Sequence, residues 1–301
     1  FDLKTGQSIH CLQLHKGYVD NVVYSPDGKT IASAGGSSSF NEDYNIYICE
    51  SKTGELLLTL KGHNSKINGL VYSPDGTKVA SCSGLIDKDT TIRVWNSSTG
   101  AMIQLFQEHT LDVDCIAFSP DGSQIISSSA RSVCLWNVKS GSVIKKIQNL
   151  PFIIYSLAFS PDGGNILCGA SNNNVFIWDT DFSQPVYPIN QFEGYVFDIK
   201  RSPNNQNVIS RCFESLSIWN ACSGQLQYKL KGKTSNIKCI TYSPNGQVLA
   251  AGRGWASDEF KYCIYIFDVL NGQVFHVLKG HTADVNCVQF MPKSRFLISG
   301  S

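Results

Sequence analysis

Charge is scarce in this sequence of 301 residues: Asp, Glu, Lys and Arg together make up 16%, and the formal net charge is +1. No block of lysines and arginines occurs, which disfavours nucleic acid or an anionic membrane as the main partner. No apolar run approaches the length of a membrane span, and no signal peptide opens the chain. We therefore expect a cytoplasmic protein with protein or peptide partners.

Catalytic signatures are also missing. The sequence has no G-x-S-x-G motif, no phosphate-binding G-x-x-x-x-G-K-[ST] and no H-E-x-x-H. Its 11 cysteines are an odd number without a C-x-x-C pair, and Cys115, Cys239 and Cys287 recur at one position of a repeated segment. Small apolar residues that pack between repeated units behave in this way, so we expect reduced, structural thiols. Together these absences predict no enzyme, no metal site and no cofactor.

What the sequence does contain is an internal repeat. A proline, often within Ser-Pro-Asp-Gly, recurs seven times, at Pro26, Pro74, Pro120, Pro161, Pro203, Pro244 and Pro292. The residue aligned with His63 lies 11 positions before this proline in all seven copies. The residue aligned with Trp95 lies 14 positions before the His63-like residue of the next copy, again in all seven cases. Fixed spacing of this kind predicts the same backbone path in each copy, even where the motif itself has changed.

The segment from Leu60 to Gly100 shows the content of one copy. Short β-rich runs alternate with turn residues, first at Ser73-Pro74-Asp75-Gly76 and last at Ser98-Thr99-Gly100. With Gly62-His63 at its start and Trp95-Asn96 near its end, the segment resembles a WD40 repeat. The resemblance implies an all-β, seven-bladed β-propeller of four-stranded antiparallel blades, which we take as one domain over residues 1–301. We letter the strands of a blade a to d from the centre outward.

The WD40 resemblance also implies a buried hydrogen-bond network inside each blade. The second copy has all four residues of this structural tetrad: His63, Ser81, Asp89 and Trp95. Other copies depart from it, since Cys49 replaces the tryptophan in the first and Ala130 replaces the aspartate in the third. A metal site at these histidines is disfavoured, because each lies in a different repeat without zinc-ligand spacing.

The two ends of the chain are expected to share the seventh blade. Phe1-Asp2 aligns with Trp95-Asn96, so Gln7 to Leu14 would be a strand d, and Arg295 to Gly300 would be a strand b. The blade would then be closed by N- and C-terminal strands, with most of its strand c missing. Because of this gap and the start at Phe1 rather than Met, we expect a fragment of a longer protein.

Length variation points to one surface. Every extra residue falls between strands b and c, in residues 35–42, 84–88 and 253–260 of the first, second and sixth copies. These loops carry residues typical of contact sites where a solvated loop would be polar: Phe40, Leu85, Ile86, Arg253, Trp255 and Phe260. The d–a loops of the same face add Tyr18, Asp20, Lys66, Asp112, Asp114, Tyr155, Tyr195, Phe197 and Asp284. The alternative is that the apolar side chains fold back and cap their own blades, and that the aspartates are ordinary loop polarity.

Several functions fit this surface. The leading hypothesis is a non-catalytic protein–protein interaction scaffold that uses the b–c/d–a loop face. Alternatives are a substrate- or signal-recognition domain of a larger kinase, NTPase or ubiquitin-ligase assembly, and a tandem-propeller protein of the cytoskeleton or cilium. Phosphopeptide recognition by Arg131, Arg211 and Arg253 is a further hypothesis. The fold alone does not choose a partner, pathway or oligomeric state.

Overall fold

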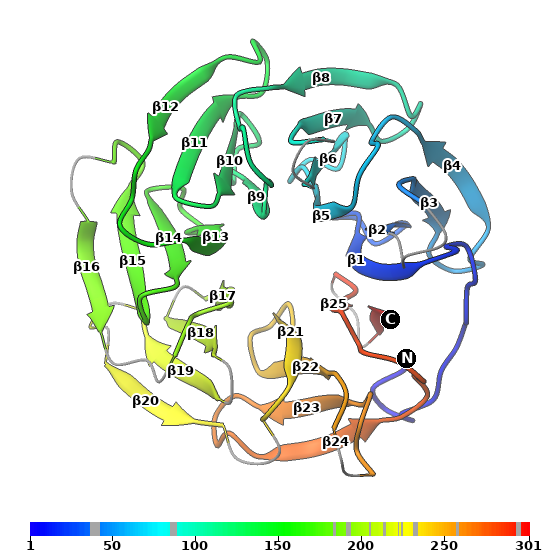
Figure 1. The fold of residues 1–301 in the computed structure, drawn as a ribbon. Helices are drawn as coiled ribbons and strands as arrows, with labels where there is room; N and C mark the ends of the chain where they lie inside the picture. The colour runs from blue at the N-terminus through cyan, green and yellow to red at the C-terminus, as the bar shows by residue number, and fades with distance from the viewer. Residues whose placement is uncertain are drawn as a thin grey trace.

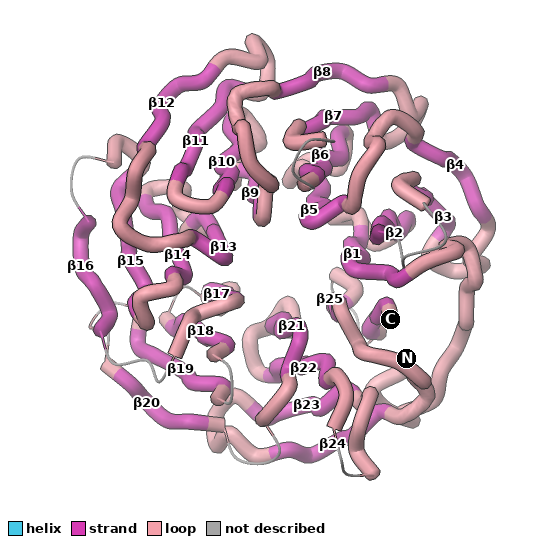
Figure 2. Tube along the Cα trace, viewed as in Figure 1, coloured by secondary structure: helices cyan, strands magenta, loops and turns pink. Residues whose placement is uncertain are grey.

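A computed structural model shows an all-β ring (Figure 1). Six antiparallel sheets of four strands and one sheet of two strands surround a central axis (Figure 2). Within each four-stranded sheet the strands follow chain order, so every blade is a meander. The described residues are 1–36, 43–84, 89–182, 185–190, 194–204, 206–212, 215–221, 223, 225–230, 234–256, 259–292 and 296–301.

The strands of the first three blades span short, regular ranges. Blade one holds β1 (Tyr18–Tyr24), β2 (Thr30–Gly36), β3 (Ile46–Glu50) and β4 (Leu56–Leu60). Blade two holds β5 (Ile67–Tyr72), β6 (Lys78–Ser83), β7 (Ile92–Asn96) and β8 (Met102–Phe106). Blade three holds β9 (Cys115–Phe118), β10 (Gln124–Ser129), β11 (Ser132–Asn137) and β12 (Val143–Ile147).

The remaining blades repeat this pattern. Blade four holds β13 (Ile154–Phe159), β14 (Asn165–Ala170), β15 (Asn174–Asp179) and β16 (Pro185–Asn190). Blade five holds β17 (Asp198–Arg201), β18 (Asn207–Arg211), β19 (Leu216–Asn220) and β20 (Leu226–Lys229). Blade six holds β21 (Ile237–Tyr242), β22 (Val248–Arg253), β23 (Ile264–Asp268) and β24 (Val274–Leu278). The two-stranded sheet holds β25 (Cys287–Phe290) and β26 (Leu297–Gly300).

The Ser-Pro-Asp-Gly segments form the a–b turns. In blade two the Ser73 hydroxyl donates to Asp75 at 2.5 Å, and the Lys78 amide donates to the Ser73 oxygen at 2.9 Å. Gly76 takes a φ of +72°, which a glycine adopts without strain. The turn therefore satisfies its own polar groups and sends the chain back antiparallel.

The core lies between blades rather than within them. Ile46 and Ile48 of blade one, for example, pack with Ile67 and Trp95 of blade two in one buried cluster. Similar clusters join each later pair, and the last joins blade six to the β25–β26 sheet. Because a single meander cannot cover both of its faces, each blade depends on its neighbours for burial.

The two-stranded sheet corrects the prediction of a seventh blade closed by N- and C-terminal strands. The structure has six four-stranded blades, and β25 and β26 fill the remaining sector between blades six and one. Phe1 exchanges backbone hydrogen bonds with Leu297 at 2.8 and 3.0 Å, and Asp2 forms an isolated bridge with Phe296. Beyond Asp2, residues 7–14 form no strand, because no described strand lies beside them to pair with; the predicted strand d is wrong.

Cysteines of the inner strands lie between blades. The thiols of Cys239 and Cys287 point at backbone carbonyls of the next unit, Val285 at 3.4 Å and Val19 at 3.6 Å. Burial raises the pKa of Cys239 and of Cys115 to about 12, so both are protonated thiols. None of the ten described cysteines forms a disulfide bond. The described part of the chain also contains no helix that could cross a bilayer.

Candidate interaction face

The structural tetrad of blade two is assembled around Ser81, which lies within strand b, β6. His63 Nδ1 lies 2.8 Å from an Asp89 oxygen, His63 Nε2 lies 2.8 Å from Ser81 Oγ, and Trp95 Nε1 donates to Ser81 at 2.9 Å. The four residues are buried, and burial lowers the pKa of His63, so its imidazole is neutral. Burial alone would raise the pKa of Asp89, but hydrogen bonds from His63 and Thr91 hold it well below its usual range. The network ties the d–a loop to strands b and c.

Other blades keep parts of this network. In blade three His109 lies 2.7 Å from Ser127 and Trp136 donates to the same hydroxyl at 2.8 Å, but His109 Nδ1 is buried without a partner. Burial lowers the pKa of His109 to about 4. In blade five the described residues keep one bond of this network: Trp219 donates to Ser210 at 2.8 Å. His109 Nδ1 lacks a hydrogen-bond partner because Ala130 occupies the position that Asp89 has in blade two.

Arg253 was predicted to contact a partner, and its burial contradicts this. Only 2% of the residue is exposed. Its guanidinium donates to the Ser235 carbonyl at 3.1 Å and to the Phe260 carbonyl at 3.4 Å, and lies 6.0 Å from the Tyr265 ring centre. Arg253 therefore braces blade six from inside.

Phe260 also departs from the expected contact surface. It is partly buried and packs against the cluster between blades five and six, with Lys279 Nζ 5.0 Å from its ring centre. This is the capping arrangement that the sequence left open as the alternative. Phe40, Leu85 and Ile86 lie outside the described residues, so their assignment stays a prediction.

Trp255 is the loop residue that remains on the surface. Trp255 is 62% exposed. Its backbone is fixed on both sides, since its amide donates to Asp284 at 2.7 Å and its carbonyl accepts from Asn236 at 2.9 Å. Trp255 is therefore exposed to solvent on a backbone that is held at this position.

The predicted d–a residues lie around the same rim. Tyr18 is 53% exposed, while two aspartates form ion pairs between neighbouring units: Asp20 with Lys66 at 3.3 Å and Asp284 with Lys238 at 3.2 Å. Burial raises the pKa of Asp20 against the opposing effect of Lys66. These pairs fix the register of adjacent d–a loops.

Blades three to five bring the other rim residues together. The rings of Tyr155, Tyr195 and Phe197 form a cluster with centroids 5.2 to 6.2 Å apart. Asp114 stands nearby, and burial with the neighbouring Asp112 charge raises its pKa to about 6. Tyr195 is half exposed, so the cluster offers aromatic surface at the rim of the central opening.

The three arginines of the phosphopeptide hypothesis do not converge. Arg131 is exposed in blade three, whereas Arg253 is buried in blade six. Arg211, in blade five, donates to the Ile237 carbonyl at 3.2 Å and lies 5.4 Å from the Phe197 ring centre. With two of the three engaged in internal contacts, a shared phosphate site has no basis here.

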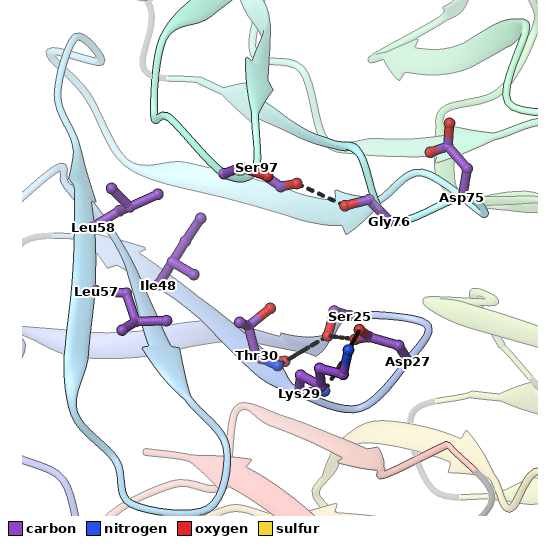
Figure 3. Close-up of a pocket in the computed structure, with 11 residues that line it drawn as sticks. Ser25, Asp27, Lys29, Thr30, Ile48, Leu57, Leu58, Asp75, Gly76 and Ser97 are labelled. Atoms are coloured by element: carbon purple, nitrogen blue, oxygen red, sulfur yellow. Dashed lines mark hydrogen bonds and ion pairs between the residues drawn. The ribbon is translucent and has the colours of Figure 1, made fainter.

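A groove on the opposite face escaped the sequence analysis. It encloses about 480 Å³ between blades one and two, where a–b and c–d turns lie (Figure 3). Aliphatic side chains of β3 and β4 form one side, and turn residues of both blades form the rest; the lining is Ser25, Asp27, Lys29, Thr30, Ile48, Leu57, Leu58, Asp75, Gly76, Ser97 and Ser98. The run Leu56-Leu57-Leu58 was the available signal, because three successive leucines cannot all face one core from a strand.

Comparison with known families agrees with this geometry. The family described as WD domain, G-beta repeat, matches residues 6–48, 54–96, 100–137, 145–179, 224–259 and 272–301. Comparison with curated proteins finds none that matches. The matched segments cover most of the chain, and a typical one starts at the outer strand of one blade and continues into the next blade, as 54–96 does from β4 to β7. The chain therefore belongs to the WD40-repeat family of β-propellers.

Proposed function

We propose that this propeller is a non-catalytic protein–protein interaction scaffold that docks a peptide or a folded partner on its b–c/d–a loop face. WD40 propellers are in general interaction domains rather than enzymes. In the proposed ring, β25 and β26 act as the two inner strands of a seventh unit, so that the loop face is continuous. A cytoplasmic location remains part of this proposal.

The observation that carries the proposal is the presentation of Trp255. Trp255 is 62% exposed and its backbone is already held by Asp284 and Asn236, so little backbone freedom is lost when a partner covers it. Tryptophan is also the residue type that most often dominates binding energy at interfaces. The Lys238–Asp284 pair beside it supplies a polar rim around this apolar anchor.

Affinity capture from cell extract with the purified chain tests the proposal. Trp255→Ala should weaken binding of the main captured proteins by about 30-fold and lower their recovery accordingly, since hot-spot truncations remove about 2 kcal/mol or more. Leu270→Ala is the matched control, because Leu270 is 85% exposed in a c–d turn on the other face. Both variants should unfold at the temperature of the wild type. Equal recovery with all three proteins would refute the assignment of this face.

A further inference from the structure

The groove between blades one and two has a separate character from the loop face. It opens among the a–b and c–d turns, and its volume of about 480 Å³ suits one or two side chains rather than a folded domain. Leu57 is 48% exposed at its edge, while Ile48 lies buried at its base. Apolar surface is thus available inside a polar frame (Figure 3).

The residue at position 58 explains why space is left here. By repeat spacing Leu58 of blade one corresponds to Gln104, Lys145 and Tyr228 of blades two, three and five. These longer side chains reach the next unit: Lys145 Nζ contacts the Asp181 carbonyl, and Tyr228 lies 3.1 Å from where a β-carbon on Gly272 would stand. At Gly100 the same point is approached by Leu60 at 3.1 Å, whereas Leu58 comes only to 3.9 Å, so the side chain at position 58 itself fills less of the space between blades one and two.

Carboxylates surround the mouth of the groove. Asp27 and Asp75 line it, and their counterparts Asp121 and Asp162 continue along blades three and four. Hydrogen bonds from Ser73 and Thr77 lower the pKa of Asp75 to about 2, and the same kind of serine contact lowers the pKa of the other three. All four are therefore ionised at any physiological pH.

The four turns that carry these carboxylates lie side by side around the ring, and we call the four carboxylates the acidic arc. A β-carbon on Gly76, Gly122 or Gly163 would lie 3.4 to 3.5 Å from the proline of the preceding turn. Beyond blade four the charge ends, since Asn204 and Asn245 occupy the aspartate position. The lysines beside the arc are held weakly: Lys29 is 82% exposed and pairs with Asp27 at 3.4 Å, and Lys78 pairs with Asp75 at 3.8 Å.

We propose that this groove and its acidic arc dock a second partner, an extended protein segment in which an apolar side chain is followed by Lys or Arg. The apolar side chain enters between Leu57, Leu58 and Ile48. The basic side chains lie over Asp27 and Asp75, where they replace weak lysine pairs with direct contacts. Since the loop face is left open, the ring would hold two partners at once.

Fluorescence anisotropy with short synthetic peptides tests the proposal on the purified chain. The probes carry one leucine followed by two arginines at three different spacings, and matched peptides carry glutamate in place of arginine. At least one arginine probe should bind, with an affinity that falls as salt rises. Leu57→Ser should weaken it about tenfold, and Asp27→Asn with Asp75→Asn should weaken it by a similar factor.

The chain provides its own controls. Asn204 and Asn245 each accept a hydrogen bond from the serine of their own turn at 2.7 Å, as Asp27 does, so the Asn variants should keep the turn intact. Ile144 holds the Leu57 position in blade three and is 47% exposed, so Ile144→Ser should leave binding within about twofold. Binding of the glutamate peptides, no binding of any arginine probe, or equal loss with Ile144→Ser would overturn the proposal. If Trp255→Ala still binds the arginine probe as the wild type does, the groove binds independently of the loop face.

Discussion

Blades two and six solve one structural problem with different side chains. In blade two the Ser83 hydroxyl donates to the Ser65 carbonyl of the d–a loop at 3.1 Å, beside the tetrad. In blade six the aligned residue is Arg253, and its guanidinium donates to the aligned carbonyl of Ser235. A buried carbonyl needs a donor, but any donor that reaches it will serve.

The rest of the two blades follows from that choice. Blade two has Ser81 and Trp95 joined by a hydrogen bond, whereas blade six has Ala251 and Phe267, which are fully buried without polar contacts to make. The backbone path is the same although the polar network has been exchanged for apolar packing and one arginine. The repeat is therefore defined by spacing and burial, and the tetrad is one way among several to brace it.

The largest effect is expected from breaking the network of blade two. Asp89→Ala would leave His63 Nδ1 and the Asn64 amide, 3.2 Å from the carboxylate, without acceptors in a buried site. Leaving two buried donors unsatisfied, at roughly 2 kcal/mol each, should lower the free energy of unfolding by about 4 kcal/mol. Urea denaturation measures it. A loss below about 1 kcal/mol would mean that packing, not the tetrad, holds blade two.

A somewhat smaller loss of stability is expected from breaking the contacts of Arg253 in blade six. Arg253→Met keeps much of the side-chain volume but removes the donors to Ser235, Phe260 and Tyr265, which should lower the free energy of unfolding by about 3 kcal/mol. Arg253→Lys keeps a donor and should lose less. Equal stability of Arg253→Met and wild type would show that the guanidinium is not the counterpart of the blade-two network.

Much of the ring could be predicted from repeat spacing. Blade five is not matched by the family comparison between residues 179 and 224, yet the fixed distances around Pro203 and Trp219 predicted it, and β17 to β20 confirm it. The prediction failed at residues 7–14. Strand formation there needs a neighbouring edge, and spacing within a segment carries no information about whether that neighbour is present.

The candidate site was less predictable, because the contacts available around each side chain decide whether it faces solvent or packs inside. Trp255 and Phe260 belong to one loop and look alike in sequence, but only Phe260 finds an apolar cluster within reach. Arg253 was predicted to be a surface residue because charged residues are seldom buried, and the Ser235 carbonyl that accepts its hydrogen bond inside blade six cannot be recognised in the sequence. The groove at Leu57 arises between two blades, so neither repeat alone encodes it.

The smallest effect is expected from adding the missing residue to blade three. Ala130→Asp would place a carboxylate where His109 Nδ1 has no partner, and Ala130 already has a φ of 47°, which aspartate tolerates better than alanine. The new hydrogen bond should raise the free energy of unfolding by about 1 kcal/mol at neutral pH.

The same hydrogen bond should also raise the pKa of His109 from about 4, which NMR titration measures. In wild type the unfolded chain binds the proton first, so His109 lowers stability as pH falls from about 6.5 towards 4, and the variant should lose less over that range. An unchanged His109 pKa would mean that the aspartate does not reach the ring, and that spacing alone does not recreate the network of blade two.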